Sequence, residues 1–150
     1  MYSTIRPIAY EDLAFAVAIL QEGSLTPEYE EPARVDAYWQ AVKDTRSNGG
    51  DVLVAEVDGD VVGVCQVIIF THFQHAGQPC CELESVHVRR DHRSQGIGTK
   101  MLAHAEGIAR KAGCHRVQLT SRNVRVDAHR FYLAQGFEQT SQGFKKSLLD

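Results

Sequence analysis

The chain has 150 residues, enough for one domain with its own hydrophobic core. Its net charge of -3 and pI near 6.1 exclude the basic surface that bulk nucleic-acid binding requires. No apolar run approaches the roughly 20 residues of a membrane-spanning helix, and the N-terminus lacks a secretory signal pattern. We therefore expect a cytoplasmic protein that binds neither nucleic acid nor membrane.

The first half of the chain predicts a strand over Thr4–Ile8 and a helix from Tyr10 to Gly23. An acidic segment, Ser24–Pro32, leads into a second helix over Pro32–Thr45, whose apolar residues share one face. Strands at 51–57 and 61–70 flank an Asp-Gly pair, which is typical of a hairpin turn. The apolar residues of the second helix are Val35, Tyr38, Trp39 and Val42.

A central run, Glu82–Ala112, follows the loop Thr71–Pro79. It predicts a strand over Glu82–Val88, a charged turn over Arg89–His92, and a glycine-containing turn that enters a long amphipathic helix. The apolar residues of this helix recur at three-to-four-residue spacing, and they are Ile97, Met101, Leu102, Ala105, Ile108, Ala109 and Ala112.

Gly96 and Gly98 stand where the strand feeds this helix. Glycine lets the backbone pack closely there, and the first N–H groups of the helix, together with the positive end of its dipole, suit a phosphate. Arg93 and Lys100 would add positive charge. Because a Gly-x-Gly pair alone is weak evidence, a simple tight turn is the alternative.

The last part of the chain predicts a strand over Arg116–Thr120, a helix over Asp127–Gln135 capped by Gly136, and a final hairpin or extended pair over Gln139–Leu149. The order of these elements predicts a mixed α/β sheet with helices on both faces. We expect the four cysteines to be free thiols, with Cys114 as a possible covalent acyl carrier.

The pattern Arg93-x-x-Gly96-x-Gly98 resembles the pyrophosphate-binding motif of the GNAT superfamily, the acyl-CoA-dependent N-acyltransferases. The segment Asp127–Phe137 resembles the second motif of that family, and the strand carrying Glu82 and Glu84 precedes the first motif at the family's distance. The resemblance implies one α/β (α+β) domain over residues 1–150, with a central mixed, mostly antiparallel sheet flanked by helices. It also implies acetyl-CoA as cosubstrate and a homodimer.

Transfer of an acyl group to an amine requires a base, because an alkylamine with a pKa near ~10.4 arrives protonated. Glu84 matches the family's base position, with Glu82 in reserve. In a regular strand the two carboxylates share a face roughly 6–7 Å apart, and their repulsion would raise a carboxylate pKa. The alternative is that both glutamates are solvated or paired with arginines.

Tyr132 is the expected acid, since a phenol with a pKa near ~10 can protonate a thiolate of similar basicity. In the resembling family this tyrosine faces the thioester sulfur, and here the pair Phe131-Tyr132 supplies it. The alternative is a half-buried aromatic residue without a catalytic role.

The resemblance also assigns the acyl-CoA contacts. The pantetheine arm would pair with Val86, His87 and Val88, with an N–H of Val86 or His87 as oxyanion donor. The family's usual pantetheine-binding asparagine is replaced here by Arg125, and Asn123 lies two residues away. The pyrophosphate would meet Arg93, Ser94, Gln95, Gly96, Ile97, Gly98 and Thr99.

No histidine pair stands at helical spacing with a third ligand, so no metal is expected. His72, Phe73 and His75 could instead shape the acceptor pocket, as could the acidic segment Ser24–Pro32, which would attract an ammonium group. An ordinary solvated loop is the alternative for both segments.

These observations favour an acetyl-CoA-dependent N-acetyltransferase of a small-molecule primary amine, acting by direct attack in a ternary complex. The segment Asp127–Tyr132 looks like that of aminoalkylphosphonate N-acetyltransferases, so a small amine with an anionic group is worth testing. An acetyltransferase of protein amines and a non-catalytic acyl-CoA-binding module are the alternatives.

Overall fold

The computed structural model describes residues 2–149 in two compact units, of which the first ends at Gln118 and the second begins at Leu119. The single domain expected over residues 1–150 stays a prediction, because the chain divides into these two units. Among the described residues, no helix is both long and apolar enough to cross a membrane.

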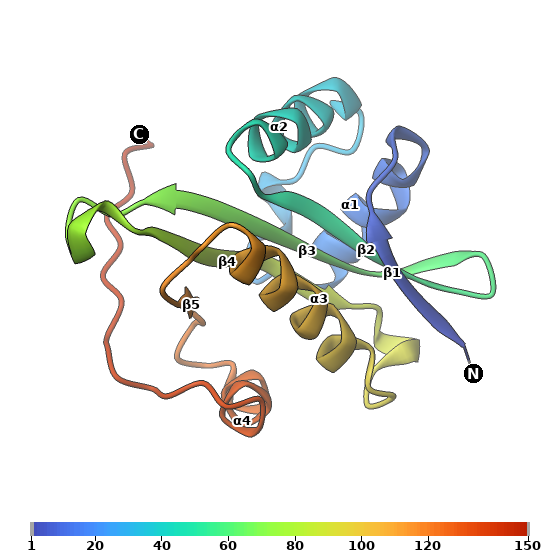
Figure 1. Cartoon of the computed structure of the whole chain (residues 1–150). Helices are drawn as coiled ribbons and strands as arrows, with labels where there is room; N and C mark the ends of the chain where they lie inside the picture. The colour runs from blue at the N-terminus through green and yellow to red at the C-terminus, as the bar shows by residue number, and fades with distance from the viewer. Residues whose placement is uncertain (1, 150) are drawn as a thin grey trace. The chain divides into compact units, whose positions relative to one another are not determined.

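The first unit is built on a five-stranded sheet with the order β1-β2-β3-β4-β5 (Figure 1). All neighbouring strands are antiparallel except β4 and β5, which are parallel. The sheet is thus mixed and mostly antiparallel, as predicted. The strands are β1 (Ser3–Pro7), β2 (Asp51–Val57), β3 (Asp60–Thr71), β4 (Pro79–Val88) and β5 (Val117–Gln118).

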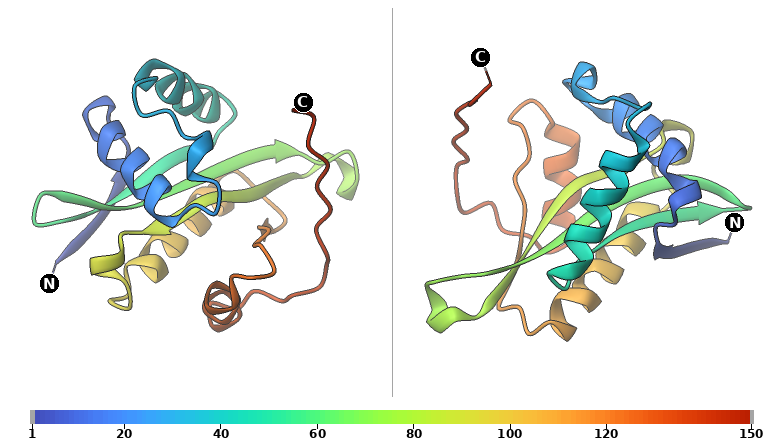
Figure 2. Two further views of the ribbon diagram at one scale, coloured as in Figure 1. Left: turned by 180° about the vertical axis from the view of Figure 1, so that it is seen from behind. Right: turned by 90° about the horizontal axis from the view of Figure 1, so that it is seen from above.

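Helices cover both faces of this sheet, which confirms the predicted layers (Figures 1 and 2). α1 (Leu13–Gly23) and α2 (Val35–Ser47) lie on one face, and α3 (Ile97–Lys111) lies on the other. Since both faces are covered, β2 and β3 carry nearly continuous buried runs rather than a polar-apolar alternation. Single 3₁₀ turns connect the larger elements at Tyr10–Asp12, Pro27–Tyr29, His75–Gly77 and Arg90–His92.

The predicted apolar faces pack as the periodicity indicates. Of the seven apolar residues predicted to share one face of α3, five are buried, and Ile108 and Ala112 are half-buried. On α2, Val42 is buried and the other three residues pack against the same core. The β2–β3 hairpin turns at Asp58 and Gly59, both with positive φ, as an Asp-Gly pair favours. The five buried residues of α3 are Ile97, Met101, Leu102, Ala105 and Ala109.

The second unit contains α4 (Val126–Ala134), close to the predicted helix, and Gly136 follows it with a left-handed φ of +92° as predicted for the cap. The predicted hairpin over Gln139–Leu149 is wrong, because residues 138–149 form neither helix nor strand and are exposed. Their large apolar residues, Phe144, Leu148 and Leu149, do not alternate with polar ones, so they define no strand face to bury.

Candidate active site

β4 and β5 pair at only two positions, Cys81 with Val117 and Glu82 with Gln118. The predicted strand Arg116–Thr120 is therefore shorter in the structure than expected. Within residues 2–149, the remainder of β4, from Leu83 to Val88, has no strand partner along this edge. An edge of this kind can accept an extended ligand through backbone hydrogen bonds.

A β-bulge interrupts β4 directly after Glu84. Gln66 of β3 faces Glu84, and Val64 faces His87, so Cys65 alone lies opposite two residues of β4. Ser85, at the bulge, has a φ of +54°, which is uncommon for a residue other than glycine. A bulge bends its strand and redirects the side chains that follow. The bulge thus separates the part of β4 that carries Glu82 and Glu84 from Val86–Val88, the part expected to bind pantetheine.

The two glutamates of β4 have different environments. Glu84 is exposed, whereas Glu82 is half-buried and its Oε2 atom is buried without a hydrogen-bond partner in the described part of the chain. Burial raises the pKa of the Glu82 carboxyl, and the neighbouring charge of Glu84 acts in the same direction, while a hydrogen bond from Gln118 opposes the rise. A solvent-facing carboxylate therefore stands beside a half-buried one whose pKa is raised.

The glycine turn at the start of α3 has the expected geometry. Gly96 occupies the N-cap position with a φ of +81°, and Ser94 also has a positive φ. Gly96 offers no side chain to cap the helix, so the amides of the first turn face an exposed turn, residues 93–96. Such a helix terminus suits an anion.

The two expected cations of this turn differ in placement. The guanidinium of Arg93 donates from Nε to the carbonyl of Val88 at 2.9 Å, which holds the turn to the end of β4. The ammonium of Lys100 instead donates to Ser3 Oγ at 2.8 Å, so its charge is directed at β1. The prediction that Lys100 adds charge to the turn is therefore not met by its side-chain contacts.

The remaining predicted site residues belong to the second unit. Tyr132 lies on α4 and contacts the rings of Phe131 and Phe137 edge-on, with centroids 5.3 and 5.7 Å away. Arg125 occupies the N-cap position of α4, and Asn123 is exposed in the turn before it. The placement of these residues beside the acyl group stays a prediction.

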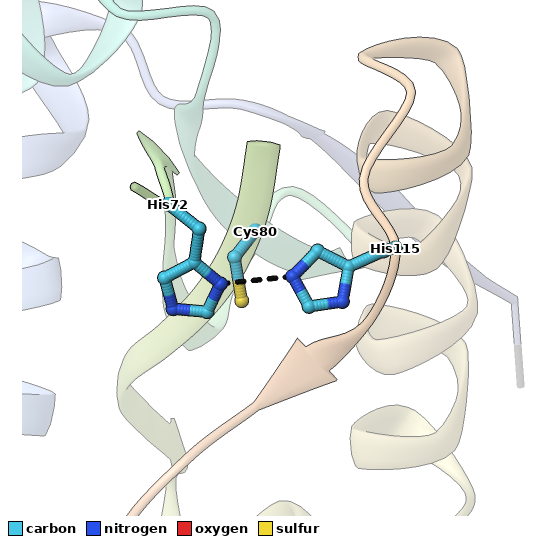
Figure 3. Close-up of side chains that lie close together, drawn as sticks. All are labelled: His72, Cys80 and His115. Atoms are coloured by element: carbon cyan, nitrogen blue, oxygen red, sulfur yellow. Dashed lines mark hydrogen bonds between the residues drawn. The ribbon is translucent and has the colours of Figure 1, made fainter. Parts of the chain in front are cut away.

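One cluster was missed by the sequence analysis. His72, Cys80 and His115 come from three separate segments, and their side chains point toward one another (Figure 3). Spacing along the chain could not reveal them, because the β3–β4 hairpin and the parallel β4–β5 pairing bring them together.

The acidic segment lies partly at a small surface pocket of about 220 Å³, lined by Tyr29, Glu31, Arg34, Tyr38 and neighbouring alanines. The hydroxyl of Tyr38 donates to Glu30 Oε1 at 3.1 Å and accepts from the amide of Glu31 at 2.9 Å. These hydrogen bonds hold the end of the acidic segment to the side chain of Tyr38 in α2.

Comparison with known proteins gives a consistent result. The model of the Acetyltransferase (GNAT) family matches residues 16–137. An aminoalkylphosphonate N-acetyltransferase from Salmonella typhimurium is 38% identical over 91 residues, which cover 61% of this chain and 58% of that protein. An aminoglycoside N(6')-acetyltransferase type 1 from Stenotrophomonas maltophilia is 30% identical over 141 residues, which cover 93% of this chain and 88% of that protein.

Among solved structures, a protein from Bacillus halodurans C-125 described as a transcriptional regulator superposes with a TM-score of 0.89 at 29% identity. The superposition covers 98% of this chain and 100% of that one. The fold thus extends along nearly the whole chain.

Proposed function

This chain belongs to the acetyltransferase (GNAT) family, and on that basis we propose that it moves the acetyl group of acetyl-CoA to the primary amine of a small molecule. The observation that carries the proposal is the exposed, left-handed turn at Gly96, which Arg93 ties to the end of the open β4 edge. The turn at Gly96, which suits a phosphate, thereby continues from the open edge of β4, which suits an extended ligand.

Acetyl-CoA binds along this path in our proposal. Its pyrophosphate accepts hydrogen bonds from the amides between Arg93 and Thr99. Its pantetheine arm pairs with Val86–Val88 as an added strand, and the N–H of Val86 or His87 stabilises the oxyanion. Asn123 contacts the pantetheine in place of the asparagine that the family usually carries at the position of Arg125.

The chemistry is direct attack in a ternary complex. Glu84, which is exposed, takes a proton from the substrate ammonium, directly or through water. The amine nitrogen then forms a bond to the acetyl carbon, the C–S bond breaks, and Tyr132 donates its proton to the departing thiolate. The nitrogen of the new amide gives up a second proton, which returns to the Tyr132 phenolate through solvent, and Glu84 releases its proton to solvent. Glu82 is the second candidate for the base, favoured by the raised pKa of its carboxyl.

An acyl-enzyme on Cys114 is less well supported. Burial raises the pKa of the Cys114 thiol, with the nearby Cys80 acting in the same direction. Because the thiolate is the nucleophilic form, a raised pKa disfavours acyl transfer through this side chain.

The acceptor we propose is a small amine that also carries an anionic group. The support comes from the relative named as an aminoalkylphosphonate N-acetyltransferase, and the relative named for aminoglycosides points to small molecules as well. The assay incubates the chain with acetyl-CoA and an aminoalkylphosphonate, an aminoglycoside or a lysine-containing peptide, and measures thiol release. Turnover with the aminoalkylphosphonate supports the proposal. Turnover with the peptide alone would indicate a protein acetyltransferase. Absence of turnover with every amine would indicate a binding module.

The glycine turn gives a prediction with a matched control. In Gly96→Ala we expect the KM for acetyl-CoA to rise about tenfold, because an L-residue in the left-handed region costs roughly 1–2 kcal/mol and shifts the amides of the turn. Gly59→Ala imposes a similar strain, since Gly59 has a φ of +86° and, like Gly96, no atom within 4 Å of an added Cβ. Steady-state kinetics should show an unchanged KM in Gly59→Ala. An equal increase of the KM for acetyl-CoA in both variants would contradict the proposal that acetyl-CoA binds at this turn.

We also propose, from the family resemblance, that the protein is a cytoplasmic homodimer. Analytical ultracentrifugation of the purified chain tests the dimer.

A further inference from the structure

His72, Cys80 and His115 form a compact cluster of potential metal ligands (Figure 3). One ligand atom from each side chain lies within 4.8 Å of the others, and His72 Nδ1 is 2.8 Å from His115 Nε2. Cys80 is fully buried, whereas the two histidines are half-buried, so an ion can reach them from solvent.

The backbone fixes all three positions before any ion binds. The amide of His72 donates to the carbonyl of Gln78 at 3.2 Å, across the β3–β4 turn. The amide of His115 donates to Pro79 at 3.0 Å, and the amide of Cys81 donates to Arg116 at 3.1 Å. The ligands therefore come from three segments that hydrogen bonds already hold together, which lowers the entropic cost of forming a metal site.

An aromatic contact also holds one of the ligand rings in place. The ring of His75 stacks on that of His115, with centroids 4.1 Å apart. Burial raises the pKa of the Cys80 thiol, and a hydrogen bond with Arg116 opposes that rise.

We propose that His72, Cys80 and His115 bind one late first-row transition-metal ion, with zinc as the expected ion and water at the fourth position. Two nitrogens and one thiolate are a donor set that tetrahedral zinc accepts. With Zn–N distances near ~2.0–2.1 Å, the two nitrogens would stand roughly 3.3 Å apart, so the rings need to part by only about half an ångström. The thiol proton of Cys80 passes to solvent when the ion binds.

The ion would tie the start of β5 to the β3–β4 turn. β5 pairs with β4 at only two positions, so its attachment otherwise depends on few hydrogen bonds. The cluster lies at the N-terminal end of β4, and the glycine turn follows its C-terminal end. The site is thus separate from the proposed pyrophosphate site, and metal binding can be measured without any acetyl transfer.

The experiment titrates the chelator-treated, untagged full chain with Co²⁺, a spectroscopic substitute for Zn²⁺, and then displaces it with Zn²⁺. We expect one equivalent to bind and a thiolate-to-cobalt charge-transfer band to appear. Cys80→Ser should abolish that band. His115→Ala and His72→Ala should each weaken the affinity by about 100-fold or more, since loss of even an indirect partner costs roughly 10- to 100-fold.

Two variants serve as matched controls. Cys114→Ser removes a partly buried thiol that adjoins His115 in the sequence, and His104→Ala removes an exposed histidine of α3. Both should bind cobalt as the parent chain does. Far-UV circular dichroism checks each fold, and if Cys80→Ser does not fold, the two histidine variants decide. Failure of the parent chain to bind cobalt, or binding that survives loss of either histidine, would overturn the proposal.

Discussion

Glu84→Gln is expected to lower kcat by about 100-fold or more, with little change in the KM for acetyl-CoA, because general-base catalysis typically contributes roughly 10²–10⁴-fold. Glutamine keeps the size of the side chain and removes only its ability to accept the proton. Glu84 is exposed on β4, so the substitution buries no new polar group and should leave the fold intact. Steady-state kinetics with a saturating amine measure the loss.

The pH dependence separates loss of a base from a general disturbance. Without Glu84, the reaction depends on the fraction of amine that is already neutral, which rises about tenfold per pH unit below a pKa near 10.4. The rate of the variant should therefore climb toward the parent rate as the pH increases. A loss of equal size at every pH would contradict the assigned role.

Glu82→Gln is the matched comparison, two residues along the same strand. If Glu84 is the base, Glu82→Gln keeps most of the activity. Its buried Oε2 has no hydrogen-bond partner in the described part of the chain, so a neutral amide at this position costs little. If instead Glu82→Gln loses activity and Glu84→Gln does not, the base is Glu82.

Tyr132→Phe is expected to lower kcat by about 100-fold or more, because the leaving thiolate loses its proton donor. Phenylalanine keeps the ring that contacts Phe131 and Phe137, so α4 should retain its packing. The KM for the amine should change little, since the hydroxyl acts on the sulfur.

Tyr2→Phe provides the control for this substitution. Tyr2 is 79% exposed beside β1, so loss of its hydroxyl should leave kcat unchanged. An unchanged kcat in Tyr132→Phe as well would show that the thiolate departs without help from this residue.

Local patterns allowed most of the elements to be predicted. The apolar spacing on α2 and α3 and the Asp58-Gly59 pair are patterns of residues close together in the sequence, and the structure confirms the elements that they predict. The segment 138–149 offers no such pattern, and a strand there would depend on a distant partner.

Features that arise from strand pairing could not be predicted. The bulge at Ser85 depends on the register between β3 and β4, and serine gives no signal of a left-handed backbone. The contact of Lys100 with Ser3 joins residues far apart in the sequence. His72, Cys80 and His115 likewise meet only because the sheet aligns their segments.

A crystal structure of the chain with bound CoA tests the central claim most directly. The account predicts diphosphate oxygens about 2.9 Å from the amides of Gly96, Ile97 and Gly98, and the CoA sulfur beside the hydroxyl of Tyr132. A diphosphate bound away from these amides, or a sulfur out of reach of Tyr132, would contradict it.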